Sequence, residues 1–124
     1  MKKIISLTIV LVTLVACQTS NKKTVFTCND EEVIVKICVN TKKPELDSIQ
    51  KVLKEQRNIS FDFQQTIFNS DQTIDVLDFV VKGPEGYTCH NNTELYMSDE
   101  YQGFFRDYRK GAPIPFRCGL MEEQ

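Results

Sequence analysis

Apolar and polar residues alternate along three stretches of the chain with the two-residue period of a half-buried β-strand. Their apolar positions are Val33, Val35, Ile37 and Val39, then Ile59, Phe61 and Phe63, and finally Leu77, Phe79 and Val81. Residues 29–32 and 69–71 have the composition of turns, and the first of these turns follows a short strand at residues 25–27. The pattern therefore predicts antiparallel strands with one face in a core.

Between the first and the second of these stretches, apolar residues recur with a longer period. The apolar residues that recur at helical spacing are Leu46, Ile49, Val52 and Leu53. Thr41 is placed to cap the helix, and Pro44 suits its first turn, where amide groups have no intrahelical partner. Acidic residues lie near the start and basic residues near the end, which matches the helix dipole. The spacing predicts an amphipathic helix from Pro44 to Gln56.

The order strand, helix, strand, strand predicts an α+β fold. We expect one amphipathic helix packed on a small antiparallel-rich sheet, in a single domain of residues 25–124 with a β-α-β-β core. Residues 83–86 form a turn, and residues 87–97 predict one more strand. Beyond them the pattern is irregular, and we expect an irregular C-terminal extension.

The chain begins as a secretory signal does. Lys2 and Lys3 form a basic start, residues 4–15 form an apolar run, and Ala16 is a small residue at the expected cleavage point. A membrane-spanning helix needs about 20 apolar residues, so this run is too short to remain as a span. The sequence therefore predicts a signal peptide that is removed after residue 16.

The four residues Leu14-Val15-Ala16-Cys17 resemble the lipobox of bacterial lipoproteins. This resemblance implies that Cys17 becomes the first residue and that its thiol and amine carry palmitate-type acyl chains. Two or more chains anchor a protein firmly in a bilayer. Residues 17–24 are then the lipidated cysteine and a flexible polar tether. The alternative is an ordinary cleaved signal with an incidental cysteine.

The residues after Cys17 bear on location. Gln18 stands where an aspartate favours inner-membrane retention in enteric bacteria, and residues 21–24 contain lysines without the acidic residues of a surface-export signal. The resemblance to lipoproteins therefore implies a lipid anchor in the outer membrane, with the domain facing the periplasm.

Cleavage before Cys17 leaves 108 residues, which suffice for one domain with a modest core. Without Lys2 and Lys3, 13 basic residues face 17 acidic ones, a net charge near −4. Phosphate binding requires a basic stripe, so the composition argues against a nucleic-acid partner.

Four cysteines remain after Cys17, namely Cys28, Cys38, Cys89 and Cys118. An even number in an exported chain predicts two disulfides, each contributing about 2–4 kcal/mol. Loop-closure entropy mildly favours Cys28 with Cys38 and Cys89 with Cys118, although all three pairings stay open. The alternative is a metal site that combines these thiols with His90, but the chain lacks the usual ligand spacing.

Residues 39–81 carry a second resemblance. The stretch VNTKKPELDSIQKVLKEQRNISFDFQQTIFNSDQTIDVLDFVV is similar to a small β-α-β-β module of Bacteroidota envelope proteins, including the outward tails of antibiotic-sensor-type metallopeptidases. The positions that carry it include Thr41, Glu45, Leu46, Ile49, Leu53, Ile59, Phe61, Phe63, Asn69 and Ile74. The His-Glu-x-x-His zinc motif of those sensors is absent from the sequence. The resemblance therefore implies an accessory fold of unassigned activity.

A segment near the C-terminus mixes aromatic and cationic side chains that are enriched at protein interfaces. Its candidate partner-binding residues are Tyr101, Phe104, Phe105, Arg106, Tyr108 and Arg109. The alternative interpretation is that the aromatic residues close the open side of a small sheet.

Catalytic motifs are not apparent in the sequence: His90 is the sole histidine, and neither a glycine-rich phosphate loop nor a Ser-His-Asp set occurs. Acidic residues such as Asp75 and Asp78 are interpreted as solvated positions. We therefore expect a membrane-anchored, non-catalytic protein-interaction module without metal or cofactor, whose partners are the bilayer and an envelope protein. The alternatives are a structural or peptidoglycan- or saccharide-binding lipoprotein, or an inhibitor of a foreign envelope hydrolase.

Overall fold

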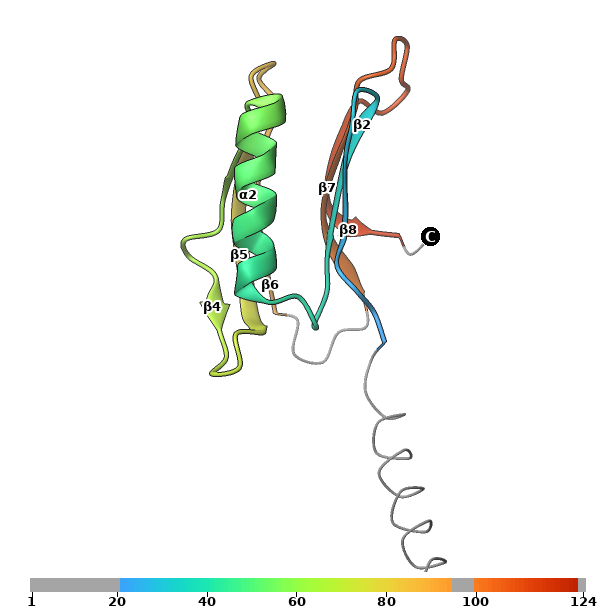
Figure 1. Ribbon diagram of the computed structural model, residues 1–124. Coiled ribbons are helices and arrows are strands. Elements are labelled where there is room, and N and C mark those ends of the chain that lie inside the picture. The colour runs from blue at the N-terminus through green and yellow to red at the C-terminus, as the bar shows by residue number, and fades with distance from the viewer. Residues whose placement is uncertain (1–20, 95–99, 123–124) are drawn as a thin grey trace, which may run out of the picture.

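A computed structural model describes residues 21–94 and 100–122, which form two layers of secondary structure (Figure 1). The first layer contains strands β1 (Val25–Cys28), β2 (Glu32–Ile37), β7 (Tyr101–Asp107) and β8 (Phe116–Met121). The second layer contains helix α2 (Lys43–Arg57) and strands β3 (Ser60–Asp62), β4 (Ile67–Phe68), β5 (Ile74–Lys82) and β6 (Thr88–Glu94). The second layer is one continuous segment, whereas the first joins the two ends of the described chain.

The first layer is an antiparallel sheet in the order β1-β2-β7-β8. Val35 of β2 lies opposite Phe104 of β7, which in turn lies opposite Cys118 of β8. A Cβ atom on Gly103 would lie 1.8 Å from the carbonyl oxygen of Val35. Only glycine therefore allows the β2 and β7 backbones to approach this closely.

The second layer is organised around β5. Strand β5 pairs antiparallel with β3 and β4 along one side and with β6 along the other. Helix α2 lies next to β3 and also contacts β1, so it covers one edge of the space between the layers. The disulfide between Cys89 of β6 and Cys118 of β8 links the layers at the opposite edge.

The N-cap of helix α2 is Lys42, one residue later than predicted. The Lys42 amide donates to the Glu45 carboxylate over 3.2 Å, which satisfies one amide at the start of the helix. Asn58 ends the helix in the left-handed conformation, with φ 54°, and donates its amide to the Lys54 carbonyl over 3.2 Å. Thr41, predicted to be the cap, is buried and bonds elsewhere.

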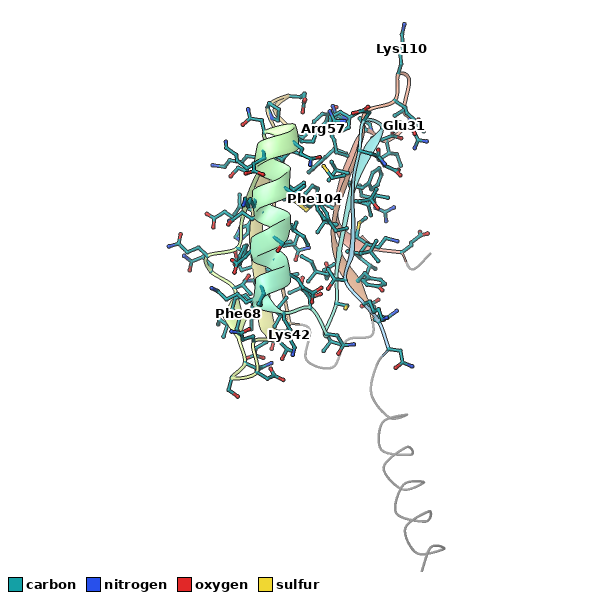
Figure 2. The ribbon with its side chains drawn as sticks, in the orientation of Figure 1. Glu31, Lys42, Arg57, Phe68, Phe104 and Lys110 are labelled. Atoms are coloured by element: carbon teal, nitrogen blue, oxygen red, sulfur yellow. A yellow bond between two sulfur atoms is a disulfide. The ribbon has the colours of Figure 1, made fainter. Side chains whose placement is uncertain are left out.

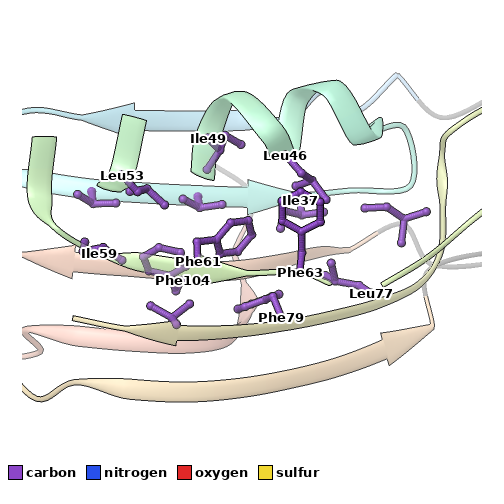
Figure 3. Close-up of a cluster of buried hydrophobic side chains, with 14 residues drawn as sticks. Ile37, Leu46, Ile49, Leu53, Ile59, Phe61, Phe63, Leu77, Phe79 and Phe104 are labelled. Carbon is purple, nitrogen blue, oxygen red and sulfur yellow. The ribbon is translucent and has the colours of Figure 1, made fainter. Parts of the chain in front are cut away.

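The core lies between the two layers (Figure 3). Leu46, Ile49 and Leu53 give the helix its buried face. Three fully buried phenylalanines connect the layers: the Phe61 ring centroid lies 5.4 Å from that of Phe79 and 6.1 Å from that of Phe104. Aromatic pairs at these separations stabilise a core beyond the area that they bury.

The structure confirms the α+β class, with one helix and antiparallel strands in the described residues, and it corrects the architecture. Two sheets are present where one was expected, and the extension predicted to be irregular contains β7 and β8. The pattern of apolar and polar residues did not predict strand β7, because apolar side chains lie on both of its faces. Phe104 enters the core, while Tyr101 and Phe105 belong to a second small cluster on the outer face with Met121.

The prediction of two disulfides is half right: Cys89 and Cys118 are bonded, whereas Cys28 and Cys38 are free thiols. Cys28 lies opposite Val33 in the β1–β2 hairpin, and Cys38 lies five residues beyond Val33. At a rise of about 3.3 Å per residue the two cysteines are about 16 Å apart. A disulfide requires Cα atoms within about 7 Å, so the extended strand keeps these thiols apart.

Candidate functional site

The segment predicted to contact a partner is strand β7 and the residues just after it, not a loop. Phe104 is fully buried in the core, so its side chain is unavailable to a partner, as the alternative packing interpretation expects. Tyr101 and Phe105 lie on the other face of the strand, in the small outer cluster. The remaining three candidates gather where β7 ends.

Two of these candidates, Arg106 and Tyr108, take part in a stack of cations and aromatic rings. The Arg106 guanidinium carbon lies 4.4 Å from the centre of the Tyr108 ring and 4.7 Å from that of the Tyr87 ring. The Arg57 guanidinium carbon lies 3.9 Å from the centre of the Tyr108 ring. We call Arg57, Tyr108, Arg106 and Tyr87 the cation–π stack. Each such contact contributes about 0.5–2 kcal/mol, depending on how far it is desolvated.

The cation–π stack joins elements that are remote in sequence. Arg57 ends helix α2, Tyr87 precedes β6, and Tyr108 follows β7. The sequence prediction missed Arg57 and Tyr87, because no local pattern relates them to β7. Burial raises the pKa of the Tyr108 hydroxyl, an effect that the positive charge of Arg57 opposes.

Arg106 also fixes the base of the loop between β7 and β8, residues 108–115, which we call the β7–β8 loop. Its Nη1 donates to the carbonyl oxygen of Asp107 over 2.6 Å and to that of Pro115 over 3.2 Å. The Asp107 amide donates to the same Pro115 carbonyl over 2.8 Å. Both ends of the loop are therefore bound to each other and to one guanidinium group.

Arg109 stabilises the loop from the solvent side. Its Nε and Nη2 donate to the two carboxylate oxygens of Asp107 over 3.0 and 3.2 Å, and Glu32 lies 3.9 Å from Nη2. The hydrogen bonds from Arg109 lower the pKa of the Asp107 carboxyl, and they raise the pKa of Arg109. Lys110 projects from the loop tip (Figure 2). Ile114 of the same loop is 50% exposed.

Residues 22–24 of the predicted tether lie against the domain at the other end of β7. The Tyr101 hydroxyl donates to the Lys23 carbonyl over 2.8 Å, and the Asn40 side-chain amide donates to the Lys22 carbonyl over 2.8 Å. The Lys22 ammonium lies 4.8 Å from the centre of the Tyr101 ring. Tyr101 therefore holds the tether through both its hydroxyl and its ring.

The buried Thr41 completes this contact. Its hydroxyl lies 2.6 Å from that of Thr24 and accepts the Cys38 amide over 3.0 Å. We call Tyr101, Asn40 and Thr41 the tether dock. The tether dock and the β7–β8 loop lie at opposite ends of the molecule. The described chain starts at the lower end of Figure 1, and Lys110 is at the upper end of Figure 2, which has the same orientation.

A polar cluster on β5 and β6 was not predicted. Asp78 accepts a hydrogen bond from the Asn92 amide over 2.8 Å, and its other carboxylate oxygen lies 3.0 Å from Nε2 of His90. The bond from Asn92 is the main cause of the lowered pKa of Asp78, and the contact with His90 adds to it. Only the β5–β6 register brings these residues together, so the sequence showed them as ordinary polar positions.

A polar groove of about 600 Å³ runs between α2 and β3. Its polar side chains come from Gln50, Lys51, Lys54, Glu55, Ser60, Asp62 and Gln64. Gln50 donates its side-chain amide to the Phe61 carbonyl over 2.8 Å. The Phe61 ring is only 1% exposed, so it offers the groove no stacking surface.

Residues 21–94 and 100–122 contain two free thiols, Cys28 and Cys38, besides their acidic side chains and His90. No cluster of three or more His, Cys, Asp or Glu side chains in these ranges is arranged to hold a metal ion. Burial raises the pKa of the Cys28 thiol, and the opposing effect of Arg57 is smaller. A raised pKa leaves less of the nucleophilic thiolate at neutral pH.

The fold and these contacts define a small, disulfide-linked α+β sandwich with a bound tether segment at one end and a stabilised loop at the other. The chain matches no family model, no curated protein sequence and no solved structure. Within the described ranges the structure contains no helix with the length and apolarity that a membrane crossing requires. Residues 1–20, which hold the predicted signal peptide and Cys17, lie outside those ranges.

Proposed function

We propose that this protein is a bacterial envelope lipoprotein whose domain is a non-catalytic protein-interaction module. Acyl chains on Cys17 anchor it in the outer membrane, and the domain faces the periplasm without metal or cofactor. The signal-like residues 1–16 and the lipobox-like residues 14–17 support the anchor. The Cys89–Cys118 disulfide is in keeping with an oxidising compartment.

The β7–β8 loop is the proposed contact surface for an envelope protein. A single observation carries this proposal: the Arg106 guanidinium binds the carbonyl groups at both ends of the loop, while Lys110 and Ile114 stay exposed at its outer part. A loop that is ordered before binding loses less conformational entropy when it binds. Arg109 is of a residue type that is enriched at protein interfaces, and the exposed Ile114 adds an apolar group on the same loop, so this surface suits a protein partner.

The placement of the loop supports the same proposal. It lies at the end of the domain away from the tether dock, so the anchor does not obstruct it. An inhibitor of a foreign envelope hydrolase would use such a loop in the same way. The identity of the captured partner separates that role from a role in assembling the host's own envelope.

A second candidate function is saccharide binding in the groove between α2 and β3. The amide, hydroxyl, carboxylate and ammonium groups along this groove match the hydrogen-bonding groups of a sugar. The buried Phe61 ring disfavours this function, because it removes the aromatic face on which a sugar ring would stack. Binding of murein fragments, followed by NMR shifts of Gln50 and Gln64 amides, tests it.

Site-specific photo-crosslinking in the native host tests the main proposal. A benzoylphenylalanine in place of Ile114 is expected to crosslink one envelope protein, whereas the same group in place of Ile67 is not. Ile67 is a matched control, because it is 54% exposed and lies on β4 in the other layer. Equal crosslinking from both positions, or none from Ile114, would contradict a contact through the loop.

Affinity for the purified crosslinked protein provides the second measurement. We expect Ile114→Asp to weaken binding about 10- to 30-fold, as the loss of an interface hot spot does. Ile67→Asp introduces the same charge on the other layer and is expected to leave binding unchanged. Circular dichroism of both variants shows whether the fold is retained.

A further inference from the structure

Two adjoining hollows lie on the outer face of the first layer, next to the tether dock. The first, of about 210 Å³, is lined by residues that include Lys36, Phe105, Arg117 and Met121. The second, of about 300 Å³, shares Arg117 and Met121 and adds Lys22, Tyr101 and Leu120. We call these two hollows the outer hollows. They join the tether segment to the exposed surface of β8.

Basic, acidic and apolar side chains line the outer hollows. The ammonium groups of Lys22 and Lys36 lie 4.8 and 5.9 Å from the centre of the Tyr101 ring. Leu120 is a large apolar side chain that is 49% exposed. Three cations, Lys22, Lys36 and Arg117, line the hollows together with the carboxylates of Glu100 and Glu122. The lining of the hollows therefore carries more positive than negative groups, in a chain whose net charge is negative.

The length of the tether limits how far this face lies from the proposed anchor. Cys17 precedes Lys22 by five residues, which span at most about 18 Å when fully extended. The tether dock holds the carbonyl groups of Lys22 and Lys23 on the domain. Acyl chains on Cys17 therefore enter the bilayer within that distance of the dock, beside the outer hollows.

We propose that the outer hollows rest on the anionic lipid headgroups of the membrane that anchors the protein, an inference that depends on the proposed lipidation of Cys17. The basic side chains attract headgroup phosphates, and the exposed Leu120, which lines the second hollow, enters the headgroup region. The tether dock sets this orientation, since it fixes the start of the domain on the same face. The second layer, with α2 and β4, then faces away from the bilayer (Figure 1).

Tryptophan fluorescence gives a direct test, because the chain contains no tryptophan. The lipidated protein is reconstituted as Leu120→Trp or as Ile67→Trp in vesicles of brominated phosphatidylcholine with phosphatidylglycerol. The two replaced residues are similarly exposed, at 49% and 54%, but lie on different layers. We expect lipid bromine to quench the tryptophan at position 120 roughly twofold more strongly than that at position 67.

Charge reversal separates headgroup attraction from mere closeness to the anchor. In the Leu120→Trp protein, Lys36→Glu with Arg117→Glu is expected to abolish the excess quenching. Arg109→Glu with Lys110→Glu makes the same change in net charge at the β7–β8 loop and is expected to leave the quenching in place. High salt should act like the first pair of substitutions, because it screens exposed charges.

Failure of the inference is distinguishable from failure of the proposed function. Vesicle-bound protein in which both tryptophans are quenched equally would overturn headgroup docking and leave the anchor standing. Protein from the native host with an unmodified Cys17, shown by mass spectrometry, would overturn the anchor and the docking with it.

Discussion

The two layers of this molecule are assembled from the chain in different ways. Residues 43–94 form the second layer as one continuous segment, so its elements pack against near neighbours in the chain. The first layer pairs β2 with β7, whose residues are more than sixty positions apart in the sequence. A local sequence pattern can reveal the assembly of the second layer. The assembly of the first layer depends on contacts that only the folded chain makes.

The faces of the two layers differ as well. Residues of β3 alternate between exposed Ser60, buried Phe61 and exposed Asp62, as a strand with one core face should. Strand β7 packs on both sides, because Phe104 enters the core while Tyr101 and Phe105 pack outside with Met121. The first layer therefore supports both the fold and the tether. The sequence of β7 looks irregular because both of its faces are packed.

Substitution of neighbouring phenylalanines on β7 gives the largest expected difference between its two faces. Phe104→Ala removes a fully buried ring between the layers and is expected to lower the free energy of unfolding by about 3–5 kcal/mol. Phe105→Ala, on the outer face, should cost less than half of that. Urea denaturation measures both, and equal costs would show that β7 is not divided between a core face and an outer face.

Removal of the disulfide tests how the layers are held together at the edge away from α2. Cys89→Ala with Cys118→Ala is expected to lower the free energy of unfolding by about 3–4 kcal/mol, because the bond closes a loop of 29 residues. Cys28→Ala serves as the control, since that thiol is free and only partly buried. A comparable loss from the control would indicate that the stability does not come from the bond.

The cation–π stack connects the first layer to the end of helix α2. Arg106→Lys keeps the charge but loses the planar group that stacks on two rings and binds two loop carbonyls, at an expected cost of about 1–2 kcal/mol. Hydrogen exchange should rise in residues 108–115. Lys110→Arg at the exposed tip should change neither the free energy of unfolding nor the hydrogen exchange of the loop. Unchanged exchange in Arg106→Lys would contradict a fixed loop base.

The tether dock predicts a smaller, local effect. Tyr101→Phe removes the hydroxyl that donates to the Lys23 carbonyl and is expected to cost about 0.5–1.5 kcal/mol. Limited proteolysis should then cleave more rapidly near residues 21–24. Tyr87→Phe, at the far end of the molecule, is the matched control. Equal cleavage of the two variants would mean that Tyr101 does not hold the tether.

The smallest effect concerns pH and the second layer. The folded protein lowers the pKa of Asp78, so this residue stabilises the fold above the unfolded carboxyl pKa of about 4, and the contribution is lost as pH falls through the folded value. Asn92→Ala is expected to raise the pKa of Asp78, because it removes the largest cause of the shift. Carbon NMR titration of the carboxyl measures the pKa of Asp78. An unchanged pKa would show that the hydrogen bond from Asn92 does not cause the shift.

Prediction from the sequence succeeded where one face of an element is buried and its neighbours in the chain are its neighbours in space. The helix was placed within a residue of its observed ends, Lys43 and Arg57, and strands were correctly expected near residues 33–39, 59–63 and 74–81. The candidate site was only partly accessible. Arg106, Tyr108 and Arg109 were named, but Arg57 and Tyr87 were not, because they join the cation–π stack from other elements.

The sequence by itself determined the α+β class and the amphipathic helix, since periodicity is a property of the local chain. Loop closure only mildly favoured Cys89 with Cys118, and it favoured Cys28 with Cys38 in the same way. The tertiary structure alone decided that the strands form two sheets, that Cys28 and Cys38 stay apart, and that Phe104 is buried while Tyr101 binds the tether. Each of these outcomes depends on strand register between distant segments. Register is set by the packing of the whole core, which no local window of residues contains.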